Sequence, residues 1–173
     1  PLNRYANVKK TGLIAINLDE GDDLAWTMVT HGNDYIIVAT KNGQAIRFSE
    51  NDVRVVGRTA RGVKAIELNG DDEVVGMGIA KSGTKILTVT EDGNGRITSA
   101  DEYRIQFRGG MGVKNFDVDK YGKVCGVGVV NDDDDIIIIS MNGIIIRMKA
   151  NEINQQSRYA GGVKVMRLDE NDR

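Results

Sequence analysis

A strict 50-residue period runs through this chain and limits what it can fold into. Glycine recurs at positions 12, 62, 112 and 162, and again at 43, 93 and 143. Arginine follows the same spacing at 58, 108 and 158, as do the hydroxyl residues Thr40, Thr90 and Ser140. Self-similarity at a fixed period of this length indicates a solenoid, a propeller or an array of repeats. We therefore expect a single domain over 1–173 with complete units at 12–61, 62–111 and 112–161, and partial units at 1–11 and 162–173.

Each complete unit contains four short runs that favour β-strands, separated by residues typical of turns. In the second unit we expect strands at Val63–Leu68, Val74–Ala80, Lys85–Thr90 and Arg96–Ala100. In the third unit the corresponding runs are Val113–Val118, Val124–Val130, Ile136–Ser140 and Ile144–Lys149. Four antiparallel strands per 50 residues are typical of a propeller blade, and no run indicates a convincing helix. The predicted fold class is therefore all-β, a propeller-like array of four-stranded antiparallel blades.

Two local patterns sharpen this prediction. Asn42-Gly43 and Asn142-Gly143 are flanked by β-branched runs, which is a strong signal for a β-hairpin. The run Ile136–Ile139 does not alternate between apolar and polar residues, so we expect a strand covered on both faces.

The composition argues against several functional classes. Cys125 is the only cysteine, so an intrachain disulfide is excluded, and we expect it to be a small buried hydrophobe. His31 is the only histidine and does not cluster with other ligand types, so neither a zinc site nor a Ser–His–Asp triad is expected. No run approaches the roughly 20 apolar residues of a membrane helix. We expect no catalytic residue, no metal and no cofactor in this chain, which is not expected to be an enzyme by itself.

The charge is balanced overall but unevenly distributed. The formal net charge is −2, from 23 basic and 25 acidic side chains. Acidic residues gather at Asp19–Asp23, Asp71–Glu73 and Asp132–Asp135, whereas much of the basic charge lies in VGRTARGVK, FRGGMGVK and SRYAGGVK. Segregation of this kind can produce a basic face on a mildly acidic protein.

A longer polar segment follows the fourth run of each unit and is expected on an exposed rim. Val53, Tyr103 and Ile153 form an apolar column that should anchor it, and the motif Arg-x-x-x-Gly-Val-Lys follows in every unit. The arginines and lysines of this motif could bind phosphates at regular intervals along a duplex. In the alternative, the arginines brace the blade junction through backbone carbonyls and the lysines protect a strand edge. Spacing alone leaves both open and slightly favours the second.

Four segments of the chain resemble the C-terminal domain of the DNA gyrase A subunit: KKTGLIAINLDEGDDL, FSENDVRVVGRTARGVKAIEL, TEDGNGRITSADEY and NGIIIRMKANEINQQSRYAGGVKVMRL. The related domain of topoisomerase IV is a weaker match. The resemblance implies a β-pinwheel, a disc whose neighbouring blades exchange strands and whose basic rim wraps or bends double-stranded DNA. It implies a non-catalytic domain of a bacterial, cytoplasmic type IIA topoisomerase that supports supercoiling. The implied partners are the remainder of the gyrase A protein and the gyrase B protein, and ATP, Mg²⁺ and the catalytic tyrosine belong to other parts of the enzyme.

Two features depart from the family pattern. The gyrase signature Q-R-R-G-G-K-G is not intact, because its nearest counterpart, residues 106–112, reads QFRGGMG. Three units and a fraction are also fewer than the roughly six blades that the resemblance to the gyrase family implies, so we expect part of a disc.

On this basis we predict strongly salt-dependent binding of duplex DNA without sequence preference. A propeller that serves as a protein-interaction scaffold without DNA binding is the alternative. The first-choice candidate DNA contacts are Arg58, Arg61, Lys64, Arg108, Lys114, Arg158 and Lys164, and the second-choice candidates are Arg47, Arg96 and Arg147.

Overall fold

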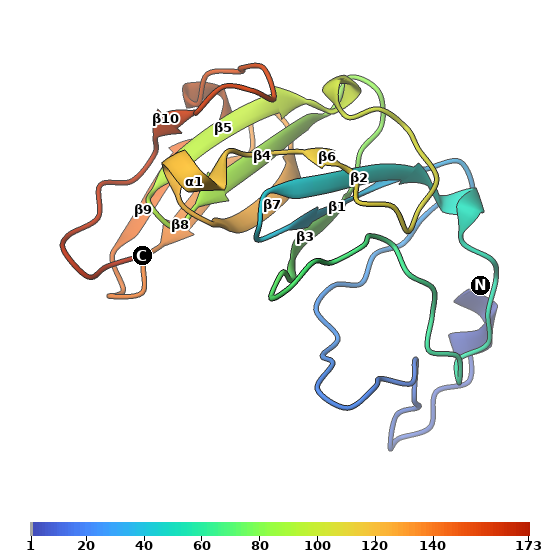
Figure 1. Ribbon diagram of the computed structural model, residues 1–173. Helices are drawn as coiled ribbons and strands as arrows, with labels where there is room; N and C mark the ends of the chain where they lie inside the picture. Colours follow the sequence, from blue (N-terminus) through green and yellow to red (C-terminus); the bar gives the residue numbers. More distant parts are fainter. Residues whose placement is uncertain (1) are drawn as a thin grey trace.

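Three β-hairpins recur at the 50-residue period in the computed structural model, which describes residues 2–173 (Figure 1). They are formed by β1 (Tyr35–Thr40) and β2 (Gln44–Ser49), by β4 (Lys85–Thr90) and β5 (Asn94–Ser99), and by β8 (Asp135–Ile139) and β9 (Ile145–Lys149). Each hairpin turn contains a glycine with positive φ, +78° at Gly43, +74° at Gly93 and +84° at Gly143. Because side chains disfavour that backbone region, the turn explains this glycine column.

Short 3-10 helices accompany the hairpins. One turn follows each hairpin, at Glu50–Asp52, Ala100–Glu102 and Ala150–Glu152, and another lies at Leu2–Tyr5. The hydroxyls of Ser49 and Ser99 cap the first two of these turns by accepting hydrogen bonds from the backbone N–H groups of Asn51 and Asp101. Such caps satisfy N–H groups that would otherwise lack a partner, and they favour a turn directly after the hairpin.

Strands from later in the chain complete two of the hairpins into four-stranded sheets. Blade A has the order β3-β1-β2-β6, with β3 at Val74–Ile79 and β6 at Val113–Lys114. Blade B has the order β10-β5-β4-β7, with β7 at Val124–Val130 and β10 at Val163–Lys164. Hairpin C is β8 and β9. Because β6 lies between β5 and β7 in the chain but pairs with β2, neighbouring blades exchange strands. The all-β, propeller-like prediction is confirmed.

The two complete blades have an inner and an outer edge. At the inner edge β3 packs against β7, and glycines permit this approach, because a Cβ at Gly78 would lie 2.5 Å from Cγ2 of Val129. The short strands β6 and β10 lie at the opposite edges of their sheets, and Figure 1 shows β6 beside β2. We call this outer edge the rim.

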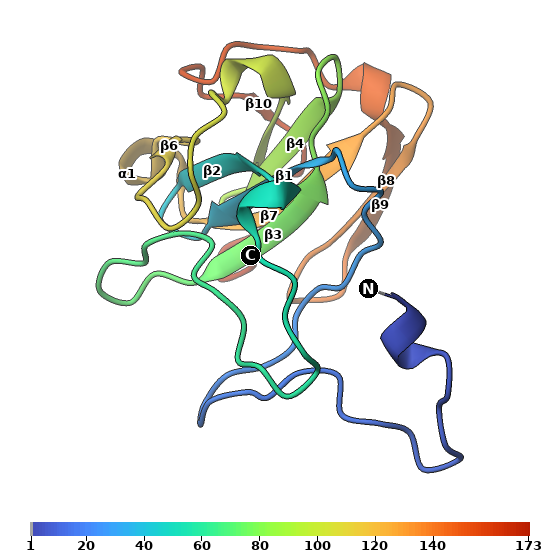
Figure 2. The same cartoon turned by 90° about the vertical axis from the view of Figure 1, so that its right-hand side faces the viewer.

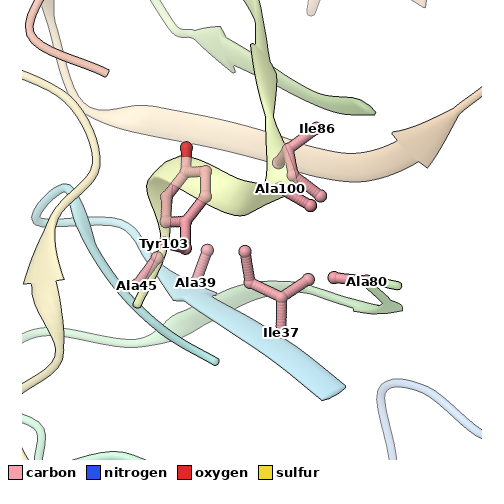
Figure 3. Close-up of a cluster of buried hydrophobic side chains, with 7 residues drawn as sticks. All are labelled: Ile37, Ala39, Ala45, Ala80, Ile86, Ala100 and Tyr103. Carbon is pink, nitrogen blue, oxygen red and sulfur yellow. The ribbon is translucent and has the colours of Figure 1, made fainter. Parts of the chain in front are cut away.

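Two hydrophobic clusters lie between successive blades. Ile37 of blade A is 1% exposed and packs in one cluster with Ile86 of blade B and with Tyr103 (Figure 3). A second cluster joins Leu87 of blade B to Ile153. The predicted anchoring of the polar segments is thus confirmed for Tyr103 and Ile153, which are 0% and 4% exposed. Val53, by contrast, is 39% exposed, because no blade precedes it among the described residues.

The predicted strand at Val63–Leu68 is absent, and only two residues of Val113–Val118 are paired, as β6. By the 50-residue period, residues 63–64 correspond to β6 and β10, each of which pairs with a hairpin about 70 residues earlier in the chain. No such hairpin precedes β1 in the described chain, so residues 63–64 have no strand to pair with. Much of the chain before β1 and between β2 and β3 accordingly extends away from the sheets (Figures 1 and 2). Ile66 is the exception, because it is 5% exposed and packs in a cluster with Ile36 of β1 and Phe48 of β2.

Three further expectations are corrected by the structure. A four-residue helix, α1, spans Val118–Tyr121, where no helix was expected. The prediction that β8 is covered on both faces is wrong, because Ile137 and Ile139 are 60% and 62% exposed. Their counterparts in β1 and β4 are covered by the next blade, and hairpin C has no next blade among residues 2–173. Cys125 is exposed rather than buried.

Candidate nucleic-acid interface

The polar segment after each hairpin runs along the rim of the preceding blade. Ile105 forms a parallel bridge with Arg47 of β2, and the N–H of Gln106 donates to the Arg47 carbonyl at 2.9 Å. In the next unit the N–H of Gln156 donates to the carbonyl of Ile97 at 2.8 Å. We call residues 104–114 rim segment A and residues 154–164 rim segment B. Each lies over the outer part of one blade and ends in the short strand that closes that blade.

The column arginines of both rim segments brace backbone carbonyls. Nη1 of Arg108 donates to the carbonyl of Lys64 at 2.8 Å, and its Nε donates to the carbonyl of Asp52 at 3.0 Å. One unit later, Nη1 of Arg158 donates in the same way to the carbonyl of Lys114. Both side chains are half-buried. The bracing role that spacing slightly favoured is therefore what the structure shows for these two arginines.

The column lysines lie farther out. The side chains of Lys64 and Lys114 are 58% and 52% exposed, and their Nζ atoms lie 2.6 Å from Glu67 and 3.3 Å from Asp117. Lys164 is also exposed, and its Nζ donates to the carbonyl of Asp92 at 2.8 Å. Exposed ion pairs of this kind contribute little free energy. These three ammonium groups can therefore exchange their present partners for phosphate oxygens.

The remaining first-choice candidates lie in the segment between β2 and β3. Arg58 and Arg61 are exposed, and Nη1 of Arg61 lies 2.8 Å from a carboxylate oxygen of Asp19. This places them near the start of the chain and not on the rim of either complete blade.

The second-choice candidates divide between the interior and the surface. Arg47 is 3% exposed, and its Nη1 donates to the carbonyl of Ala100 at 2.8 Å. Arg96 is fully buried. Arg147 is 68% exposed and forms a 2.7 Å ion pair with Asp135, which raises the pKa of Arg147. Only Arg147 of these three presents its guanidinium to solvent.

Arg96 is the centre of a buried polar network that the sequence analysis did not identify. Its Nη1 donates to the carbonyls of Arg158 and Ala160 at 2.8 and 2.6 Å, and its Nη2 donates to the carbonyl of Asn115 at 2.5 Å. The guanidinium also stacks 4.6 Å from the centre of the Phe116 ring. Arg96 thus fixes the backbone of rim segment B and the residue that follows Lys114.

The same network includes a tyrosine hydroxyl and has consequences for ionisation. The hydroxyl of Tyr103 donates to Oδ1 of Asn115 at 2.5 Å. Burial lowers the pKa of Arg96 and raises the pKa of Tyr103, and each group partly offsets the shift of the other. One sequence signal for this network exists, because Arg96 stands in a column that is otherwise isoleucine, at Ile46 and Ile146.

Several carboxylates accept hydrogen bonds from backbone N–H groups of turns. Asp72 accepts from the N–H of Asn42 at 2.8 Å, and Asp172 accepts from the N–H of Asn142 at 3.0 Å, one hundred positions later. Asp34 accepts from Lys81 and from His31, and these contacts hold the pKa of Asp34 at about 2. The rim is nevertheless not free of acid, since Glu67, Asp117 and Glu102 lie beside its cations.

No helix among residues 2–173 is long and apolar enough to cross a membrane. Within the same residues, no three histidine, cysteine or carboxylate side chains gather in a way that could hold a metal ion.

Comparison with known proteins identifies the family. The sequence model described as "DNA gyrase C-terminal domain, beta-propeller" matches the chain four times in succession, at residues 1–31, 34–81, 84–131 and 134–173. The chain belongs to this family. The recognition of the gyrase C-terminal domain family made from the sequence is thereby confirmed.

Individual relatives match about a third of the chain, and within that part more than half of the residues are identical. The DNA gyrase A protein of Halalkalibacterium halodurans is 54% identical over 63 residues, which is 36% of this chain and 8% of the relative. The DNA gyrase A protein of Clostridium acetobutylicum is 55% identical over 60 residues, 35% of this chain and 7% of the relative. The matched segment is therefore a small part of the curated relatives.

Solved structures extend the similarity to nearly the whole chain. The C-terminal domain of DNA topoisomerase IV superposes with a TM-score of 0.91 at 27% identity, over 98% of this chain and 54% of that one. The DNA gyrase A C-terminal domain gives a TM-score of 0.82 at 28% identity, over 94% of this chain and 56% of that one. The fold is thus shared with both enzymes, and the chain spans about half the length of these domains.

Proposed function

We propose that the rim of this domain binds duplex DNA without sequence preference and bends it, so that the parent topoisomerase can introduce supercoils. The observation that carries the proposal is the exposed lysine at the same position of successive units, Lys64, Lys114 and Lys164, two of which lie in the outermost strands of their blades. Cations at regular intervals along a curved edge match the regular spacing of phosphates along DNA.

The individual cations take different roles in this proposal. Lys64, Lys114, Lys164, Arg58 and Arg61 contact phosphates through exposed groups. Arg108 and Arg158 chiefly position the lysines, by holding the carbonyls of Lys64 and Lys114, and offer their remaining N–H groups to the backbone of the DNA. Arg147 is a weaker candidate because Asp135 already pairs with it. We omit Arg47 and Arg96 from the contact set because both are buried.

Electrostatics supply the driving force. Bending about 20–30 base pairs by 40–90° costs on the order of 1–6 kcal/mol, which phosphate neutralisation and counterion release can offset. If about six phosphates are neutralised, the logarithm of the binding constant should fall with the logarithm of salt concentration at a slope of roughly −5. In our proposal the parent enzyme is a bacterial, cytoplasmic topoisomerase. It also contains the remainder of the gyrase A protein and the gyrase B protein, and its ATP and Mg²⁺ chemistry lies in those parts.

The test compares two triple variants of equal charge change. Lys64, Lys114 and Lys164 are replaced by glutamine in one variant, and three lysines of the inner strands and turns, Lys41, Lys81 and Lys85, are replaced in the other. Binding to a random-sequence linear duplex is measured across a salt series for each variant, and thermal melting checks that each is folded. The proposal expects the first variant to lose affinity and to reduce the salt slope by about 3, about one unit per lysine that contacts a phosphate. Equal losses in the two variants would mean that net charge, and not the rim, governs binding.

A double variant that should strengthen binding provides a second test of the rim. Glu67→Gln and Asp117→Asn remove the carboxylates that pair with Lys64 and Lys114. The double variant should bind duplex DNA more tightly than the unchanged chain. A decrease in affinity would show that these lysines do not face the phosphates.

A further inference from the structure

Rim segment A carries apolar side chains at positions where rim segment B is polar or lacks a side chain. Ile105, Phe107 and Met111 are 53%, 84% and 60% exposed. Fifty residues later the corresponding positions are Gln155, Ser157 and Gly161. Large exposed apolar side chains at the edge of a sheet are unfavourable in water, and such a group therefore points to a binding partner.

The backbone that presents these side chains is fixed on both sides. The N–H of Gln106 donates to the carbonyl of Arg47 at 2.9 Å, and the N–H of Gly109 donates to the carbonyl of Ala65 at 2.6 Å. Between them, Arg108 is held by the carbonyls of Lys64 and Asp52. Phe107 is therefore exposed on an anchored segment, and binding would not require the ordering of a loose loop.

Several cations lie near Phe107, together with the carboxylate of Glu67, which pairs with Lys64. Arg104 is exposed three positions before it, Arg108 follows it, and Arg108 touches the carbonyl of Lys64, whose ammonium group faces solvent. An aromatic ring between phosphate-binding groups matches duplex DNA, in which an apolar base stack lies between two charged backbones. Proteins that bend DNA insert apolar side chains between base pairs in this way.

We propose that Phe107 enters a groove of the bound duplex and partly unstacks one base step, so that the bend is concentrated at blade A. Met111 packs beside it against the exposed sugar and base edges. Blade B has Ser157 at the corresponding position, and its exposed aromatic side chain, Tyr159, stacks on Arg158 instead, so we assign blade B contacts to the DNA backbone only. This inference rests on the proposed function, because it assigns a local bending device to the same DNA-binding rim.

The natural variant for the test is Phe107→Ser, because the next unit carries serine at that position on the same backbone. The reciprocal variant, Ser157→Phe, adds an aromatic ring to rim segment B. The probe is a short duplex with 2-aminopurine at a single TA step, since pyrimidine–purine steps unstack most easily. Affinity across a salt series, 2-aminopurine fluorescence and the bend angle from end-to-end energy transfer are measured on the same samples.

The unchanged chain should increase 2-aminopurine fluorescence on binding and shorten the end-to-end distance. Phe107→Ser should lose the fluorescence increase, reduce the bend and weaken binding by at least about fivefold, with an unchanged salt slope because the phosphate contacts remain. Ser157→Phe should increase the fluorescence signal. If the unchanged chain binds with a steep salt slope and Phe107→Ser matches it within twofold in affinity and in fluorescence, the insertion is refuted and the rim proposal stands. If the unchanged chain shows no salt-dependent binding, the proposed function itself fails, and the insertion fails with it.

Discussion

Replacement of Arg96 by methionine should strongly destabilise this domain. The side chain is fully buried and donates to the carbonyls of Arg158, Ala160 and Asn115. Each of these carbonyls would lose its charged donor, at about 1–3 kcal/mol per unsatisfied buried group. Removal of a buried charge offsets part of that loss. We expect a net decrease of about 3–5 kcal/mol in the free energy of unfolding.

The loss can be measured by urea unfolding followed by circular dichroism, and by thermal melting. For a domain of this size, 1 kcal/mol corresponds to about 2–4 °C, so the melting temperature should fall by about 6–20 °C. Arg147→Met is the matched control, because Arg147 is exposed and its side chain pairs with Asp135, which is itself at the surface, rather than with buried carbonyls. That variant should melt with the unchanged chain. A loss below about 1 kcal/mol for Arg96→Met would refute the view that this network joins the rim to the blades.

Two further predictions concern backbone and pH. Gly43→Ala should lower the free energy of unfolding more than Gly83→Ala does. Both glycines have positive φ, +78° and +80°. A Cβ at Gly43 would lie 2.5 Å from the Phe116 carbonyl oxygen, whereas a Cβ at Gly83 would meet nothing within 4 Å. Strain alone costs about 1–2 kcal/mol, so urea midpoints that are equal for the two variants would contradict the close packing. The Asp34 carboxyl has a folded pKa of about 2 against an ordinary value of 3.8. Its contribution to stability should be complete above about pH 4 and lost as the pH falls toward 2, so the difference in urea midpoint between the unchanged chain and Asp34→Asn should shrink over that window.

The sequence alone predicted the parts of the fold that depend on local pattern. The 50-residue period, the glycine turns and the β-branched runs identified the hairpins, and β4 and β7 have the predicted bounds. Long-range pairing was harder to predict. Val63–Leu68 has the same pattern as the segment that contains β6, but it forms no strand because a strand of this kind requires a preceding hairpin. A period identifies equivalent positions and says nothing about which copy lacks a neighbour.

For the candidate interface, too, local pattern was predictable and long-range contacts were not. Periodicity found the arginine and lysine columns, and the structure places both on the rim for blades A and B. The sequence did not separate side chains that face outward from those that face inward, as Arg96 and Arg147 illustrate. A buried guanidinium requires carbonyl acceptors that converge from segments about 20 and 60 residues away, which no local pattern reveals.

The exchange of strands between units has a consequence for synthesis on the ribosome. Ala45 of β2 pairs with Val113 of β6, a residue 68 positions later in the chain. At about 5–20 residues per second, the free edge of β2 therefore waits about 3–14 s for its partner to be made. During that interval an unpaired strand edge is available to other chains, and each new unit repeats the delay. Pinwheel domains should thus tolerate slow translation poorly between a hairpin and the later strand that completes its sheet.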